Sequence, residues 1–200
     1  MIKLTNVQKK YSGNYVLDNV TLDFSESGIY ILQGINGSGK STIIKLLTGI
    51  VYKTSGELKI DNTISYLPDK FILPKLMKVK NYLSLVLERK SKVDQLISKY
   101  QIPNKRIGEL SKGNLQKLGL LQIFEYEADC YILDEPIDGL DEFAKKLVKD
   151  IIKEKLLMKK IIIMSLHNKT YFNDLNPKIY DVKEGRLNEK RKKLQANQSN

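Results

Sequence analysis

The sequence has one cysteine, one histidine and five prolines among 200 residues, and it has no long apolar segment. A single cysteine cannot build a disulfide framework, so we expect Cys130 to be a reduced, buried side chain. The longest apolar runs cover only a few residues, as at 161–164, whereas a membrane-spanning helix needs about 20. Residues 1–5 lack the apolar core of a signal peptide. These absences predict a cytoplasmic protein.

Positive charge exceeds negative charge by 11, from 34 Lys and Arg residues against 23 Asp and Glu residues. An excess of this kind suits proteins that bind nucleic acid or an anionic membrane surface. The lysines are nevertheless spread along the chain, except for a basic cluster at 190–193 that precedes a polar tail. We therefore interpret most of the charge as a solvated, lysine-rich surface, with a specific anionic partner as the alternative.

The spacing of apolar residues predicts an α/β domain. Continuous apolar runs at 131–133 and 161–164 are typical of strands buried on both faces of a parallel sheet. Shorter strands near the N-terminus predict an antiparallel sheet, and the middle of the chain has helical periodicity. Strands are predicted at 2–7, 16–24, 28–32, 56–60 and 63–67, with a turn at 61–62 and a hairpin at 178–187. Helices are predicted at 43–49, 79–100, 115–124 and 143–157.

The segment from Gly34 to Thr42 fits the P-loop pattern of a glycine, four residues, glycine, lysine and a hydroxyl residue. It lies between a predicted buried strand and a predicted helix, so backbone N–H groups and the helix dipole would converge on an anion. Lys40 would reach terminal phosphates, and Ser41 would offer its hydroxyl to Mg²⁺. A glycine-rich turn without a ligand is the weaker alternative. The predicted phosphate-binding residues are Gly34, Asn36, Gly37, Ser38, Gly39, Lys40, Ser41 and Thr42.

Two acids end the apolar strand at 131–133. Asp134 is well placed to hold Mg²⁺, directly or through water, if the strand lies beside the P-loop. Glu135, the next residue, could orient an attacking water or accept its proton. Alone, the pair could be solvated acids at a strand end; together with a P-loop, the pair indicates a catalytic site.

Further segments resemble the ATP-binding cassette (ABC) ATPases over residues 1–187. Residues 110–117 resemble the ABC signature, 137–141 resemble the D-loop, 165–167 end an apolar strand with a histidine, and 66–69 lie at the Q-loop. The resemblance implies a P-loop NTPase core with a parallel sheet, an N-terminal antiparallel β subdomain and a short α-helical subdomain at about 70–125. Residues 188–200 would form a basic, polar tail.

The resemblance also implies roles within the chain's own site. Lys40, Glu135 and His167 would be catalytic, with His167 at the γ-phosphate, although a lone histidine is more often structural. Tyr11 would stack on adenine; the alternative is an ordinary aromatic residue at a strand end. Asp69 stands where the family usually has glutamine, and it would approach Mg²⁺ through water.

Other roles implied by the resemblance belong to an interface between two chains. Ser111, Gly113 and Asn114 of the signature would bind ATP held by the partner, and Asp141 of the D-loop would lie at the same interface. The signature departs from the family pattern at Lys112 and Asn114, where glycine and glutamine are typical. Lys112 adds a positive charge near phosphate, and Asn114 keeps an amide on a shorter side chain.

The function implied is that of an ABC transporter ATPase subunit of the bacterial export type, which uses ATP and Mg²⁺. Its partners would be an integral-membrane permease and a second ABC ATPase subunit, and it would lie at the inner face of the cell membrane. We expect export of a peptide or an antimicrobial. A soluble ABC-type ATPase that acts on nucleic acid or ribosomes is the alternative, which the short segment between P-loop and signature disfavours. A small-molecule kinase would not explain the signature, D-loop and histidine together.

Overall fold

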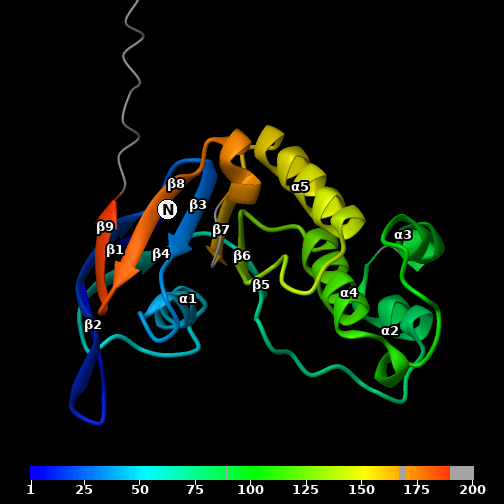
Figure 1. Ribbon diagram of the computed structural model, residues 1–200, viewed down its shortest axis with the longest axis horizontal. Helices are drawn as coiled ribbons and strands as arrows, with labels where there is room; N and C mark the ends of the chain where they lie inside the picture. Colours follow the sequence, from blue (N-terminus) through cyan, green and yellow to red (C-terminus); the bar gives the residue numbers. More distant parts are fainter. Residues whose placement is uncertain (89, 167–169, 190–200) are drawn as a thin grey trace, which may run out of the picture.

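The computed structural model describes residues 1–88, 90–166 and 170–189 of the chain. Two β-sheets occupy one side of the molecule, and a group of helices from the middle of the chain occupies the other (Figure 1). His167 and the basic cluster at 190–193 lie outside the described residues.

A three-stranded antiparallel sheet has the strand order β2-β1-β4. Its strands are β1 (Ile2–Tyr11), β2 (Asn14–Asp23) and β4 (Ser55–Ile60). Ile2 and Leu4 are buried while Lys3 between them is exposed, as expected for a sheet with one covered face. The predicted N-terminal antiparallel sheet is confirmed.

A six-stranded sheet forms the centre, in the order β5-β6-β7-β3-β8-β9. All neighbouring strands are parallel except β8 and β9, which form the predicted hairpin. Every residue of β6 and β7 is buried, which confirms the interpretation of their apolar runs. The strands are β3 (Gly28–Gln33), β5 (Ile64–Leu67), β6 (Cys130–Asp134), β7 (Ile161–Leu166), β8 (Lys178–Lys183) and β9 (Arg186–Glu189).

The turn at 61–62 joins the two sheets. Strand β4, before the turn, pairs with β1, whereas β5, after it, pairs with β6. The two strands are therefore successive in sequence without being neighbours in a sheet. The partner with which a strand forms hydrogen bonds can be distant in sequence, so the local spacing of apolar residues does not predict it.

The helices are α1 (Lys40–Leu47), α2 (Val79–Val86), α3 (Val93–Lys99), α4 (Lys112–Glu125) and α5 (Glu142–Leu157). The single helix predicted over 79–100 is two helices, because the backbone is extended at Leu87, whose side chain is buried. Helix α4 begins at Lys112 rather than at residue 115, because the Ser111 side chain caps its N-terminus. Among the helices in the described ranges, none is both long and apolar enough to cross a bilayer.

Alternate residues of the central sheet enter two apolar cores, one on each face. Ile161 and Ile163 of β7 pack with the core beneath α1 and the three-stranded sheet. Ile162 and Met164 pack with the core formed by α2 to α5. Both faces of the sheet are therefore covered. Loops lie at the carboxyl ends of the parallel strands, which is where ligands bind in open α/β sheets.

Two glycines with nearly the same positive φ give a test of this fold. Gly13 (φ +85°) faces open space, whereas a β-carbon on Gly56 (φ +83°) would lie 2.3 Å from the Asn6 carbonyl oxygen of β1. Gly13→Ala should lower the free energy of unfolding by about 1 kcal/mol, the cost of a left-handed residue. Gly56→Ala adds a backbone clash, so its loss should be clearly larger. Urea denaturation measures both, and equal losses would contradict the packing of β4 on β1.

Candidate active site

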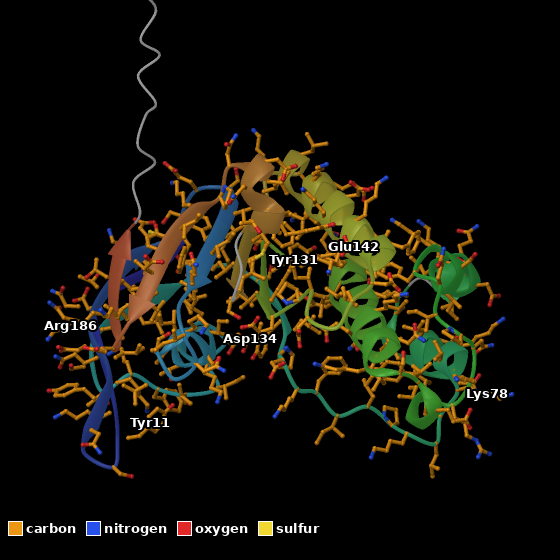
Figure 2. The ribbon with its side chains drawn as sticks, in the orientation of Figure 1. Tyr11, Lys78, Tyr131, Asp134, Glu142 and Arg186 are labelled. Atoms are coloured by element: carbon orange, nitrogen blue, oxygen red, sulfur yellow. The ribbon has the colours of Figure 1, made fainter. Side chains whose placement is uncertain are left out.

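A cavity of about 780 Å³ opens at the carboxyl ends of β3 and β6. The P-loop and the start of α1 form one wall, and the chain just after β6 forms another, at Asp134, Glu135 and Asp138. Side chains from 66–70, with Val16 and Lys112, complete the lining. The two motifs that the sequence placed far apart therefore face one cavity. Asp134 lies at the centre of the molecule in Figure 2.

The P-loop wraps the N-terminus of α1. Gly39 occupies the N-cap position with φ +112° and Gly37 has φ +78°, conformations that glycine adopts without strain. The Lys40 side chain is buried, and its ammonium group donates to the carbonyl oxygens of Gly34 (2.8 Å) and Ile35 (3.0 Å). The lysine charge is thus held over the loop, at the helix terminus that attracts anions.

The base of the P-loop is tightly packed. A β-carbon on Gly34 would lie 2.3 Å from the Val182 carbonyl oxygen and 2.6 Å from Ser38 Oγ. The Ser38 hydroxyl is itself buried and has no hydrogen-bond partner among the described residues. A buried hydroxyl of this kind is costly unless a ligand or water completes it. Ser38 does not line the cavity, so the features there that fit a bound phosphate group are the free space at Gly37 and the Lys40 charge.

Ser165 of β7 orients the two acids. Its buried hydroxyl donates to Asp134 Oδ1 and accepts from the Glu135 backbone N–H at 3.1 Å. Asp134 is buried, and Glu135 has φ +53°, a left-handed conformation that is uncommon for residues other than glycine. We predicted neither this contact nor this conformation. The only signal for Ser165 was a hydroxyl residue within an otherwise apolar strand.

Asp69 lies where the sequence placed it, on the wall of the same cavity. Its neighbour Tyr66 also lines the cavity, and burial together with the charges of Asp134 and Asp69 raises the pKa of the Tyr66 hydroxyl to about 12. The neutral phenol therefore stays next to the two carboxylates across the physiological range. The phenol is a hydrogen-bond donor that the sequence analysis did not single out.

The signature residues stand apart from this cavity. Ser111 caps α4, and its hydroxyl accepts from the Asn114 backbone N–H at 3.3 Å. Ser111, Gly113 and Asn114 do not line the cavity, whereas Lys112 does. Lys112 Nζ lies 2.7 Å from Asp138 Oδ2. Ser111 and Lys112 are exposed at the start of α4, next to the loop that follows the two acids.

Asp141 caps helix α5. Its carboxylate accepts from the Ala144 backbone N–H at 2.7 Å and lies 3.3 Å from Lys117 Nζ. The Ala144 hydrogen bond, with Lys117 as a smaller contribution, lowers the pKa of the Asp141 carboxyl. The residue predicted at an interface is therefore also a structural cap.

The comparisons with known proteins agree with this arrangement. The ABC transporter family model matches residues 17–138, more than half of the chain. An ABC transporter ATP-binding protein from Methanocaldococcus jannaschii is 33% identical over 92% of this chain and 75% of its own length. The chain belongs to the ABC transporter family. Its cassette has the fold of an ABC ATPase, and the α/β architecture with a P-loop core is confirmed.

Relatives of the cassette carry different transport names. A zinc import ATP-binding protein from Rickettsia conorii is 34% identical over 82% of this chain and 73% of its own length. A lantibiotic transport ATP-binding protein from Streptococcus pyogenes is 29% identical over 94% of this chain and 89% of its own length. One solved cassette, a dimer bound to ADP and Pi, has a TM-score of 0.81 at 22% identity and covers 96% of this chain and 98% of that chain.

Of the remaining predicted site residues, Gly34, Ser38 and Asp141 do not line the described cavity, and neither does Tyr11. Tyr11 is 42% exposed at the end of β1, with Lys9 Nζ 4.7 Å from its ring centroid. Tyr11 does not line the cavity, where Val16 of β2 lies instead, and the two labels Tyr11 and Asp134 are well separated in Figure 2. His167 lies outside the described residues, so its role stays a prediction.

The donor atoms in the cassette's cavity fit Mg²⁺. Ser41, Asp69 and Asp134 line the same space, and Mg²⁺ in proteins is usually bound by one or two carboxylates together with substrate phosphates and water. Asp134 is held by Ser165, as expected for a carboxylate that must be oriented toward a metal. Among the described residues no cluster of three or more His, Cys, Asp or Glu side chains could hold a metal, so phosphate and water ligands would complete the coordination.

Glu135→Gln tests the catalytic assignment. We expect the variant to bind ATP normally and to lose at least about a hundredfold in kcat, because the amide cannot accept a proton from water. Steady-state phosphate release and equilibrium nucleotide binding measure the two effects. Glu142→Gln, on an exposed glutamate at the start of α5, is the matched control. Wild-type turnover by Glu135→Gln would refute the assignment.

Ser165→Ala tests the orientation of Asp134. The variant removes the hydroxyl that holds both the Asp134 carboxylate and the Glu135 backbone, so the Mg²⁺ concentration for half-maximal ATPase activity should rise about tenfold. A magnesium titration at saturating ATP measures it. An unchanged magnesium dependence would show that Asp134 does not need this contact.

Proposed function

We propose that the chain is the ATP-hydrolysing subunit of a transporter whose pathway is a separate integral-membrane permease. The observation that carries the ATPase part is the single cavity that holds Lys40 of the P-loop together with Asp134 and Glu135. Phosphoryl transfer to water requires a cradle for the phosphates, a carboxylate for the metal and a group that orients the water. All three face the same space here.

In this proposal the P-loop backbone from Gly34 to Thr42 binds the phosphates, and Lys40 exchanges its carbonyl contacts for the terminal phosphate. Ser41, Asp69 and Asp134 would hold Mg²⁺, which when bound would neutralise part of the phosphate charge. Glu135 orients the attacking water and takes its proton. His167 contacts the γ-phosphate. Tyr11, at the end of β1, stacks on the adenine of a nucleotide that extends from the P-loop to this strand.

We propose that two cassettes act together. Ser111, Gly113 and Asn114 lie outside the chain's own cavity, so a phosphate that they bind is one held by a second chain. The intact γ-phosphate would contact both chains, which stabilises the closed dimer; hydrolysis removes that contact and favours opening. The dimeric solved cassette of the same fold supports this arrangement.

The permease contact is proposed for the segment between β5 and α2. Ile72 and Leu76 are 98% and 87% exposed there, and exposed apolar side chains that form a patch mark interaction sites. Residues 105–108 lie beside residues 75–78 through backbone hydrogen bonds. Both segments carry exposed cationic side chains for which no ion pair with a described residue is seen: Lys75, Lys78, Lys105 and Arg106. Lys78 and Arg106 are paired in an isolated antiparallel β-bridge, so the segment before α2 lies beside the segment that contains Arg106. The surface suits an apolar segment with acidic flanks at the cytoplasmic end of a permease.

The direction proposed is export, and the substrate proposed is a peptide or an antimicrobial. The lantibiotic transport relative, which matches 94% of this chain, supports this choice. The zinc import relative is named for the opposite direction, so the identity of the permease decides the question. With its permease bound, the subunit would lie at the inner face of the cell membrane.

Capture of the permease tests this function. Glu135→Gln with ATP and Mg²⁺ should pull a multi-span membrane protein from detergent-solubilised membranes, and Ile72→Asp with Leu76→Asp in the same chain should lose about 90% of it. Leu157→Asp, at a side chain that is 86% exposed on α5, is the control and should retain capture. Recovery of ribosomes or nucleic acid alone would overturn the transport proposal and leave the ATPase assignment standing.

A further inference from the structure

One face of α4 lies against the loop that carries Glu135. The face consists of the side chains of Lys112, Gln116 and Lys117 together with Gly113, which we call the α4 brace. Its members recur at the helical spacing that places residues on one side of a helix. Each contacts a different part of the loop 135–141. The catalytic roles proposed above do not depend on these contacts.

Gln116 is the central contact. Its side chain is buried, and its amide nitrogen lies 3.5 Å from the Glu135 carbonyl oxygen and 3.4 Å from the Pro136 carbonyl oxygen. Glu135 has φ +53°, a conformation that persists only where surrounding contacts impose it. The Ser165 hydroxyl fixes the N–H of Glu135, and Gln116 contacts its carbonyl group. The backbone of the proposed water-orienting residue is therefore held from both sides.

Two ion pairs and a close backbone contact hold the rest of the loop. Lys112 Nζ lies 2.7 Å from Asp138 Oδ2, with both side chains largely exposed. Lys117, whose side chain is only 8% exposed, lies 3.3 Å from Asp141. A β-carbon on Gly113 would lie 2.9 Å from the Gly139 carbonyl oxygen, so helix and loop are in direct backbone contact between the two pairs.

We propose that the α4 brace positions the Glu135 carboxylate for catalysis, and that Lys112, Gln116 and Asp138 are positioning residues of the ATPase reaction. The inference rests on the proposed role of Glu135. Loosening the brace moves the loop and leaves the P-loop untouched, so it lowers kcat with little effect on nucleotide binding. Lys112 occupies a signature position where glycine is typical. Its proposed role is to hold the loop through the ion pair with Asp138.

Exchange of the Lys112–Asp138 charges is the main test. Lys112→Asp and Asp138→Lys should each lower kcat about three- to fivefold, the range that an exposed ion pair allows. The double variant restores the pair with reversed polarity, so its kcat should return to within about twofold of wild type. Both side chains line the cavity, so the double variant also restores the net charge there, and kcat and KM for ATP are measured together. A change of charge alone would alter KM for ATP, whereas lost positioning lowers kcat with KM retained.

Two controls separate positioning from stability. Lys80→Asp disrupts another exposed ion pair, the 2.7 Å contact of Lys80 with Asp94, and should leave kcat unchanged. Gln116→Leu should lower kcat with nucleotide affinity and melting temperature retained, whereas Gln122→Leu on the same helix should not lower kcat. Gln122 contacts Tyr82 instead of the loop.

Two outcomes would overturn the proposed role of the α4 brace. In the first, both single charge variants have wild-type kcat; in the second, the kcat of the double variant is no higher than that of the slower single variant. A wild-type cassette that binds a fluorescent ATP analogue but hydrolyses no ATP, alone or with its permease, would instead refute the proposed function. The two failures are therefore distinguishable. Restored kcat in the double variant, together with an inactive Glu135→Gln, supports both.

Discussion

The parallel, in-register pairing of β3, β7 and β6 is the constraint on which the site depends. Leu32 of β3 and Asp134 of β6 are both register partners of Ser165 on the strand between them. These three residues are directly opposite one another on adjacent strands. The pairing therefore places the start of the P-loop, the Ser165 hydroxyl and the Asp134 carboxylate at the same level along the sheet. Because the strands are buried on both faces, slipping by one residue would turn every side chain to the wrong core.

Those parts of the molecule that depend on local chemistry were predictable. The P-loop can be identified from glycines, a lysine and a hydroxyl residue at fixed spacing. The structure places it between β3 and α1, as expected. The apolar runs at 131–133 and 161–164 could be identified as doubly buried strands because each run is continuous. The resemblance to the ABC ATPases then supplied the order of the remaining motifs.

The parts that depend on contacts distant in sequence were not predictable. Nothing local to the turn at 61–62 shows that β4 and β5 enter different sheets. The backbone is extended at Leu87, a buried residue, and this break divides one periodic segment into α2 and α3. Likewise, the spacing of Tyr11 ahead of the P-loop indicated its order along the chain but not its position outside the described cavity.

Glu135 combines two demands that favour different amino acids. Its backbone lies in the left-handed region, where glycine is the least strained residue. The reaction, in contrast, calls for a carboxylate. Selection for thermal stability alone would therefore favour loss of this side chain, and only selection for turnover would retain it. In a directed-evolution experiment on this protein, position 135 is where the two kinds of selection would diverge first.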